Sequence, residues 1–489
     1  MSKRLNTDIV AEYSANYTYD MIPEDVLLKT KQVIFDTVGL MLGGVNLDKG
    51  KYGIKLAQSF GKADECTIVG TNLKSSAFGA SYANGELAHS LDADILMAPA
   101  HMAPYVIPAV LAEAEKHHKS GKEFLQGLVL AIDVASRVGL SQGPFRNDCD
   151  DKTLTRSQQM ATIKTYGLGC DCFGGAVGIG NMLGFDADQM KDALGHAGFM
   201  LPEGSHHRFV FGPRAGMLKY SPAGWECATA VASAEMAEMG EYADREIFDG
   251  EHGFWAMQAT PKRLEDWLTK DLGTYYAIRD VRYKYYPVDG TFQAPVNVTY
   301  NIVKENNIKV EDIEHIQVHI EYMTTSFSNK VIEYHTDGCN SMYWCVAMGA
   351  YAAQHGIEPG PLWYEKETML NPEVLALMER IDYEEDPASE IAREKDNAEG
   401  MTYINRRPST IDMKLKDGRV ITASQEFMQF MSCGAPDYAI DFDQLEVKFR
   451  RNSKYTLPEE KLVDIIETIK HLEDVEDMAD FMKKLVPDA

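Results

Sequence analysis

Basic residues are scarce in this sequence. Its 489 residues include 48 Lys and Arg against 74 Asp and Glu, which gives a formal net charge of −26. A surface this acidic repels phosphate backbones and anionic lipid headgroups, so we expect neither nucleic acids nor membranes as partners. An anionic ligand would need a locally basic pocket inside this acidic protein.

Long hydrophobic runs and cysteine pairs are absent as well. Apolar runs such as 106–112 are far shorter than the roughly 20 residues that span a bilayer, so an integral membrane protein is not expected. None of the eight cysteines forms a CxxC pair that is followed by a second such pair. This spacing argues against a structural zinc site and an iron–sulfur cluster. Residues 1–8 lack the apolar core of a signal peptide, and we expect a cytoplasmic protein with reduced thiols.

The first half of the chain has the pattern of packed helices. Pro23 is followed by Glu24 and Asp25, and a proline with acidic neighbours suits the first turn of a helix. Further segments repeat the helical spacing of apolar residues, and some are rich in Gly and Ala, which lets helices approach closely. We therefore predict a large all-α domain over residues 1–268. Its helices are expected at 23–44, 104–117, 122–138, 172–183 and 222–239.

The pattern changes near residue 275. Apolar residues then alternate with polar ones, which is typical of half-buried strands, and Asp417-Gly418 between two such stretches predicts a hairpin over 411–422. We therefore predict a smaller α+β domain over residues 269–454. Its other elements are expected to be strands at 316–322 and 445–449, helices at 341–355 and 372–379, and a solvated loop or helix face at 379–398.

The C-terminal residues 455–489 are predicted to be helical. Thr456 and Glu459 have the spacing of a capping box, with Pro458 inside the first turn, and an apolar stripe follows over 462–472. The stripe predicts packing against a core, and the pattern leaves open which of the two domains supplies it.

One candidate site lies in residues 84–101. His89, Asp92 and Asp94 fall within six positions, and His101 follows after an apolar loop. Histidines close to carboxylates are typical of general acid–base catalysis. The alternative is that these residues only cap a helix end.

Two basic segments form a second group of candidates. His206, His207, Arg214 and Lys219 stand out in so acidic a chain and could bind carboxylates, although an exposed loop with ordinary basic residues fits equally well. Residues 282–289 lie at the expected entry to the second domain, and domain junctions are common places for ligand pockets. This segment contributes Lys284, Tyr285 and Asp289.

Taken in order, these segments resemble the MmgE/PrpD family over most of the chain. Residues 84–94 are similar to its NG…HxLDxDD stretch and residues 101–109 to its HPGxxVxPA stretch. Weaker similarities follow at 22–44, 173–186, 219–224 and 284–287. Family members include 2-methylcitrate dehydratase, cis-aconitate decarboxylase and iminodisuccinate epimerase.

The resemblance implies a large helical domain, an α+β lid domain with the site between them, and a homodimer. It also implies chemistry on small polycarboxylates without a metal or an organic cofactor. Asp94, His101, Lys219 and Lys284 fall on family active-site positions. Where the family often has a histidine before its Gly/Ala-rich helix, this chain reads Lys164-Thr165-Tyr166.

We therefore predict a lyase that removes a proton next to a carboxylate, with 2-methylcitrate dehydratase-like elimination favoured over cis-aconitate decarboxylase-like chemistry. Two alternatives stay open: an iminodisuccinate epimerase-like isomerase, and a non-catalytic carboxylate-binding relative. Stabilising the enolate-like charge needs cations, and removing the proton needs a base within hydrogen-bond reach. The residues predicted to act in catalysis are Asp94, His101, Lys219, Lys284 and Tyr166. Those predicted to bind the small anionic carboxylate substrate are Asp92, Arg214, His206, His207, Tyr285 and Asp289.

Overall fold

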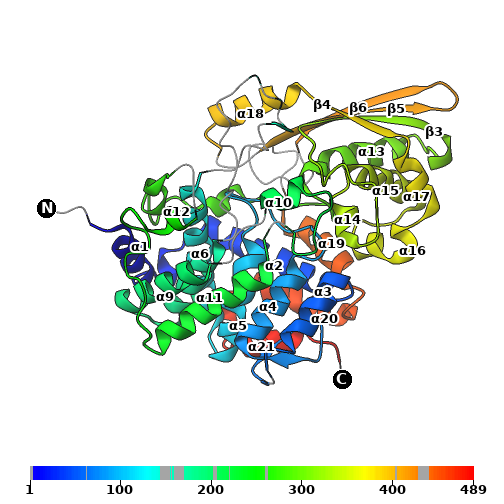
Figure 1. The fold of residues 1–489 in the computed structure, drawn as a ribbon. Coiled ribbons are helices and arrows are strands. Elements are labelled where there is room, and N and C mark those ends of the chain that lie inside the picture. The colour runs from blue at the N-terminus through cyan, green and yellow to red at the C-terminus, as the bar shows by residue number, and fades with distance from the viewer. Residues whose placement is uncertain are drawn as a thin grey trace.

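The protein is mostly helical, with a small mixed sheet in its C-terminal region (Figure 1). The computed structural model describes residues 4–61, 63–143, 153, 155, 157–158, 170–201, 206–219, 221–258, 263–401, 405–427 and 440–488. The helices before the sheet are α1 (Asn6–Ala15), α2 (Glu24–Gly44), α3 (Asp48–Ala57), α4 (Ala77–Ala88), α5 (Ala103–Lys116), α6 (Gly121–Ser141), α8 (Asp171–Leu183), α9 (Ala187–Met200), α10 (His206–Phe211), α11 (Ala223–Glu238) and α12 (Phe254–Met257). Those that follow are α13 (Gln293–Glu305), α14 (His335–Cys339), α15 (Met342–His355), α16 (Lys366–Met369), α17 (Pro372–Met378), α18 (Ala388–Ala398), α19 (Phe442–Ser453), α20 (Glu459–Lys470) and α21 (Met478–Lys484). The strands are β1 (Cys66–Thr67), β2 (Lys74–Ser75), β3 (Ile313–Ile320), β4 (Ile381–Glu385), β5 (Arg406–Leu415) and β6 (Val420–Phe427).

The helices predicted in the first half are confirmed as α2, α5, α6, α8 and α11. The strands β1 and β2, which pair antiparallel over two residues each, are an addition that the helical pattern did not predict. Helix α2 begins after Pro23, and Glu24 and Asp25 lie in its first turn, where acidic side chains favour the positive end of the helix dipole.

Close crossing of α6 and α8 depends on glycine. A Cβ at Gly178 would lie 2.5 Å from the Gly127 carbonyl oxygen and 2.6 Å from the Ala131 Cβ, so the two backbones are nearly in contact. This confirms that the Gly/Ala-rich segment is a buried, tightly packed helix. Among the described residues, α6 is also the one helix long and apolar enough to cross a membrane, and 94% of its apolar window is buried inside the protein.

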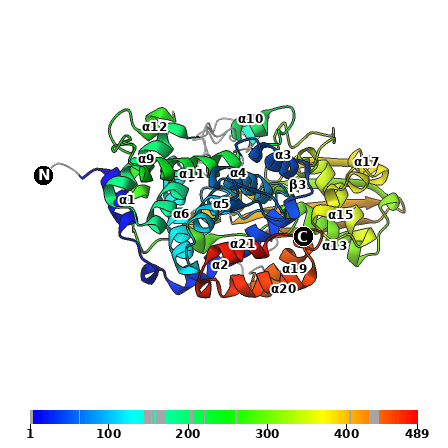
Figure 2. The ribbon, with the colours of Figure 1, turned by 90° about the horizontal axis from the view of Figure 1, so that it is seen from below.

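The C-terminal helices pack against the N-terminal ones, beside α2 (Figure 2). The Phe449 ring of α19 stacks on Phe35 of α2 with 4.7 Å between the ring centroids. The apolar stripe of α20 joins the same core. This answers the question that the sequence left open about residues 455–489.

Two predictions for this region were wrong. Residues 445–449 lie in helix α19 and not in a strand, because Leu445 and Phe449 are one helical turn apart and face the core, while Val447 between them is exposed. The predicted capping box at Thr456 is absent: its hydroxyl donates to the Leu42 carbonyl oxygen at 2.7 Å, and Pro458 is the N-cap of α20.

The sheet has the strand order β4-β3-β5-β6. Strands β5 and β6 form the predicted hairpin around Asp417-Gly418, and Gly418 takes the left-handed conformation (φ 91°) that glycine favours. Strand β4 was not predicted. It lies at the sheet edge, parallel to β3, inside the acidic run 379–398, where the exposed position tolerates its charged residues.

Two buried clusters of apolar side chains meet at one loop. One cluster joins the N-terminal helices to α19–α21, and the other joins the sheet to α13, α15 and α17. In the loop after α4, Ile95 and Met97 belong to the first cluster, and Leu91 and Leu96 belong to the second. The loop is therefore held from both sides, while the domain boundary at 268/269 stays a prediction.

We predict that Gly178→Ala lowers the free energy of unfolding by about 1–3 kcal/mol, because the added methyl group meets fixed backbone in α6. Thermal and urea unfolding would measure the loss. Gly216→Ala is the control, since no atom lies within 4 Å of a Cβ at that position. Equal stability of the two variants would contradict the close crossing.

Candidate active site

The loop that follows α4 carries the first group of candidate residues. Asp92, Asp94 and His101 are all buried, at 0%, 1% and 8% exposure. Asp92 takes a left-handed backbone conformation (φ 52°), which is costly for a residue with a Cβ and is found where the surrounding structure enforces it. The loop is therefore shaped to present its acidic side chains to the interior.

Asp94 and His101 form a buried hydrogen-bonded pair. Asp94 Oδ2 lies 2.6 Å from His101 Nδ1, so the carboxylate selects the tautomer with the proton on Nδ1 and the lone pair on Nε2. Burial lowers the pKa of His101 although Asp94 acts to raise it, so the ring is neutral near pH 7. Burial acts to raise the pKa of Asp94, but His101 and Lys284 bring it well below its ordinary value. The pair thus combines a permanent anion with an imidazole able to accept a proton.

Lys219 and Lys284 converge on Asp92. Their ammonium nitrogens lie 2.7 and 2.8 Å from the same oxygen, Asp92 Oδ1, so the two nitrogens are within about 5.5 Å of each other, the sum of those contacts. Burial acts to raise the pKa of Asp92, but the two lysines lower it to about 2. Lys284 also lies 4.0 Å from Asp94 Oδ1. The two lysines, distant in sequence, therefore share one site.

Backbone contacts bring these segments together. Leu96 and Arg282 exchange two backbone hydrogen bonds of 2.8 Å, which fixes the loop beside the segment that carries Lys284. Lys219 also has a left-handed backbone (φ 60°), and its ammonium group donates to the His89 carbonyl oxygen at 3.3 Å. Lys448 of α19 donates to the Ala93 carbonyl oxygen at 2.7 Å.

Carboxylates balance the lysines in this region. Buried pairs of 2.5 Å (Lys49 and Glu86) and 2.6 Å (Lys448 and Asp36) flank the two lysines on Asp92. An anionic ligand gains from Lys219 and Lys284 only to the extent that it competes with Asp92. Within the described chain, Asp92 Oδ2 and Asp94 Oδ1 accept no hydrogen bond, so these oxygens are available to a ligand's donor groups.

Three further candidates do not pair with this cluster. Arg214 binds Asp337 of α14 through two hydrogen bonds of 2.6 Å. Its guanidinium thereby joins the helical region to the region around the sheet, α13, α15 and α17, which we call the lid. Asp289 caps the turn at Thr291 and is among the charges that raise the pKa of Lys284. The Arg451 guanidinium lies over the Tyr285 ring, with 4.3 Å between the guanidinium carbon and the ring centroid.

The remaining candidates cannot be placed at the cluster. Tyr166 lies outside the described residues, and of His206 and His207 only the backbone, at the start of α10, is described.

Sequence reasoning missed several residues that surround the cluster. Lys49, Glu86 and Lys448 lie on ordinary helices, and nothing in their spacing points to a buried ion pair. His335 of α14 lies near Lys49, Lys219 and Asp92, which together with burial affect its pKa. His89 does stand in the segment singled out above, and its ring lies 5.4 Å from that of Tyr105.

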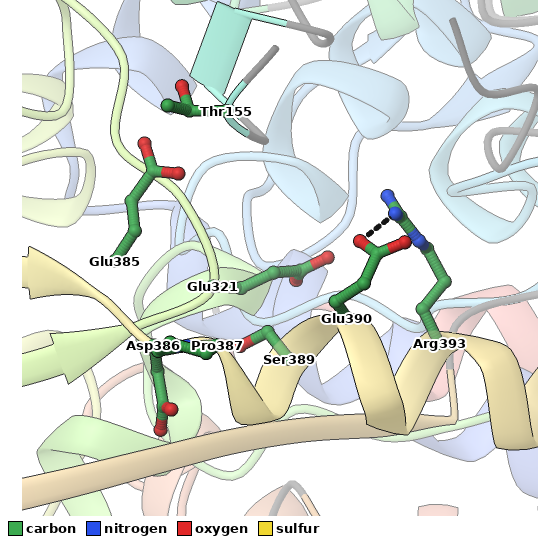
Figure 3. Close-up of a pocket in the computed structure, with 8 residues that line it drawn as sticks. All are labelled: Thr155, Glu321, Glu385, Asp386, Pro387, Ser389, Glu390 and Arg393. Atoms are coloured by element: carbon green, nitrogen blue, oxygen red, sulfur yellow. Dashed lines mark hydrogen bonds and ion pairs between the residues drawn. The ribbon is translucent and has the colours of Figure 1, made fainter. Parts of the chain in front are cut away.

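A separate cavity of about 210 Å³ lies beside α18 (Figure 3). Glu321, Glu385, Asp386 and Glu390 line it, and Arg393, the one basic residue among the described lining residues, is paired with Glu390. This lining suits a carboxylate substrate poorly. In the parts of the chain that the structure describes, no group of three or more His, Cys, Asp or Glu is arranged to hold a metal ion.

Comparisons with known proteins agree with the fold. The profile of the MmgE/PrpD N-terminal domain matches residues 8–266, and that of the C-terminal domain matches residues 286–474. A cis-aconitate decarboxylase of Aspergillus terreus is 25% identical over 343 residues, 66% of each chain. A second sequence of that name, from Aspergillus terreus strain NIH 2624, is 24% identical, and 65% of its length is covered, so the match spans just under two thirds of both fungal proteins. Human cis-aconitate decarboxylase is 24% identical over 482 residues, 93% of this chain and 89% of the human one.

We predict that His101 titrates below pH 6.5 with the proton on Nδ1, because burial lowers its pKa. Two-bond ¹H–¹⁵N spectra of histidine-labelled protein would show both properties, and His101→Gln would assign the signal. Asp94→Asn should move the pKa further down, since Asp94 acts to raise it. The exposed His355→Gln should leave the signal unchanged. A His101 pKa above 6.5, or a rise in Asp94→Asn, would contradict the prediction.

Proposed function

The chain belongs to the MmgE/PrpD family, and we propose that it is a lyase acting on a small di- or tricarboxylate. The observation that carries this proposal is the convergence of Lys219 and Lys284 on Asp92, beside the Asp94–His101 pair. The site offers cations for a substrate carboxylate and, next to them, a histidine whose tautomer is fixed.

Each group has a role in such chemistry. Breaking a bond next to a carboxylate leaves negative charge on the substrate, and Lys219 and Lys284 stabilise it in a site that excludes water. Burial acts to lower the pKa of Lys284, but Asp92 and Asp94 raise it above its ordinary value, so this lysine stays charged. His101 moves the proton, and Asp94 holds its ring.

Decarboxylation of an unsaturated tricarboxylate is the specific reaction that we propose. The sequence favoured dehydration. However, the fungal relative, which matches 66% of this chain, and the human relative, which matches 93%, are both named cis-aconitate decarboxylase. In this reaction the cis-aconitate trianion takes up one proton and yields carbon dioxide and a five-carbon dicarboxylate. The proton must come from an acid, and three substrate charges near His101 would raise its pKa and favour its protonated form.

We predict that the protein releases carbon dioxide from cis-aconitate, with one deuterium incorporated into the product in D₂O. Proton NMR and a carbon dioxide assay would follow the reaction, with and without a chelator, which should have no effect. Lys219→Met should lower kcat/KM by roughly 100-fold or more, because it removes a charge that the transition state needs. Lys395→Met, on the exposed surface of α18, is the matched control.

The same spectra distinguish the alternatives. If the protein removes water from 2-methylcitrate and does not decarboxylate cis-aconitate, it is a dehydratase, and the decarboxylase proposal is wrong. Deuterium exchange into a dicarboxylate without net loss of a group would indicate an isomerase and overturn the lyase proposal. Binding without exchange at any carbon would identify a non-catalytic relative.

We also propose that the protein acts as a homodimer in the cytoplasm, as the family resemblance implied. The exposed Trp225 ring lies near those of Phe60 and Phe78, at 5.8 and 6.4 Å between ring centroids, and this aromatic group suits a subunit contact. Light scattering at micromolar concentration should give about twice the chain mass of 54.6 kDa. A monomer mass across this range would contradict the dimer.

A further inference from the structure

His335 is a buried histidine whose polar atoms are not satisfied by the described residues around it. It is the first residue of α14, and its exposure is 3%. Neither ring nitrogen has a hydrogen-bond partner within the part of the chain that the structure describes. Because buried polar groups are nearly always paired, an imidazole with two unpaired nitrogens points to a ligand.

The position of His335 connects it to the active site. The charges of Lys49, Lys219 and Asp92 act on its ring. The Asp289 backbone nitrogen donates to the Cys339 carbonyl oxygen at 3.0 Å, so α14 lies beside the segment that carries Lys284. His335 also lines a cavity of about 470 Å³ between the helical region and the lid. The charged residues that line this cavity with it are two lysines, Lys51 and Lys366, and four acidic residues, Asp48, Glu333, Glu365 and Glu367.

Neighbouring contacts hold the ring in place. Asp337 accepts hydrogen bonds from the Tyr334 and Glu333 backbone nitrogens at 2.8 and 3.1 Å, which fixes the start of α14. Arg214, from the helical region, holds the same carboxylate through two bonds of 2.6 Å. The Tyr364 ring packs edge-on at 6.0 Å from the imidazole. The side chain is therefore presented by the lid in a position that depends on contacts with both regions.

We propose that His335 contacts the substrate from the lid side and donates a hydrogen bond to a second carboxylate of the acid held by Lys219 and Lys284. This inference rests on the proposed function. It adds to that function the contact by which the protein distinguishes a polycarboxylate from a monocarboxylate. One carboxylate binds at the lysines, and the other reaches the imidazole.

The charge state of His335 fits a hydrogen-bonding role. Burial and the nearby Lys49 and Lys219 lower its pKa to about 3, so the ring is neutral at pH 7 and offers one donor and one acceptor. With such a pKa it is a weak base, and it would not replace His101 in proton transfer. A neutral donor adds geometric selectivity for a carboxylate without placing another charge among the ion pairs.

The test is a binding measurement with tricarballylate, a saturated tricarboxylate that has no double bond for decarboxylation. His335→Ala should weaken its binding by about 10-fold or more, as expected when a hydrogen bond to a charged group is lost. In turnover of cis-aconitate the same change should raise KM by a similar factor and alter kcat by less than about threefold. His335→Asn or His335→Gln should restore binding in part, according to which ring nitrogen donates.

His355→Ala is the matched control, because His355 lies on the lid helix α15 with a side chain that is 37% exposed. It should bind tricarballylate as the wild type does. In the wild type, the ¹⁵N signals of His335 should shift on adding tricarballylate, and this readout holds even if His335→Ala fails to fold.

Other outcomes separate this inference from the proposed function. If tricarballylate shifts the His335 signals but no carboxylate is turned over, the lyase proposal fails and His335 remains a ligand contact. If the lyase works while His335→Ala binds tricarballylate as tightly as wild type, or the His335 signals do not move, His335 is not a substrate contact and the inference is overturned.

Discussion

The buried carboxylate of Asp92 is the contact on which the rest of the site depends. Lys219 and Lys284 both bind its Oδ1 atom, from parts of the chain 127 and 192 residues away. Removing one partner of such a buried group leaves an uncompensated charge, which typically costs about 3–5 kcal/mol. Asp92 and Lys219 both have a left-handed backbone, which costs free energy of folding. Both residues belong to the contact where chemistry is proposed. Site and fold are therefore stabilised by the same interaction.

Regions beyond the site hold this contact in place. Lys448 of α19 binds the Ala93 carbonyl oxygen and Asp36, so a C-terminal helix holds the loop in place. Arg214 connects the helical region to Asp337 of the lid. Because the loop between Asp92 and His101 also packs into both apolar clusters, a shift of the lid would be felt at the ion pairs. Residues outside the proposed chemistry therefore take part in holding the site together.

Local patterns were a good guide to elements and a partial guide to the site. Helices such as α2 and the hairpin β5–β6 follow from spacing and turn residues, which act within a few positions. The short segment 445–449 fits helix and strand equally, and packing on Phe35 decided for a helix. Asp94 and His101 were found because they stand close in sequence. Partners such as Lys49 and Lys448 were missed, since a buried ion pair between distant helices leaves no spacing to read.

The sequence by itself determined the helical first half, the α+β character of the second, the family, and the residues whose types suit carboxylate chemistry. These depend on local propensity and on motifs that stand in order along the chain. Only the tertiary structure decided that the two lysines share Asp92, that Arg214 binds Asp337, and that His335 is buried without a partner among the described residues. Those facts depend on which segments pack together, and burial then sets the charge state of each group once water is excluded.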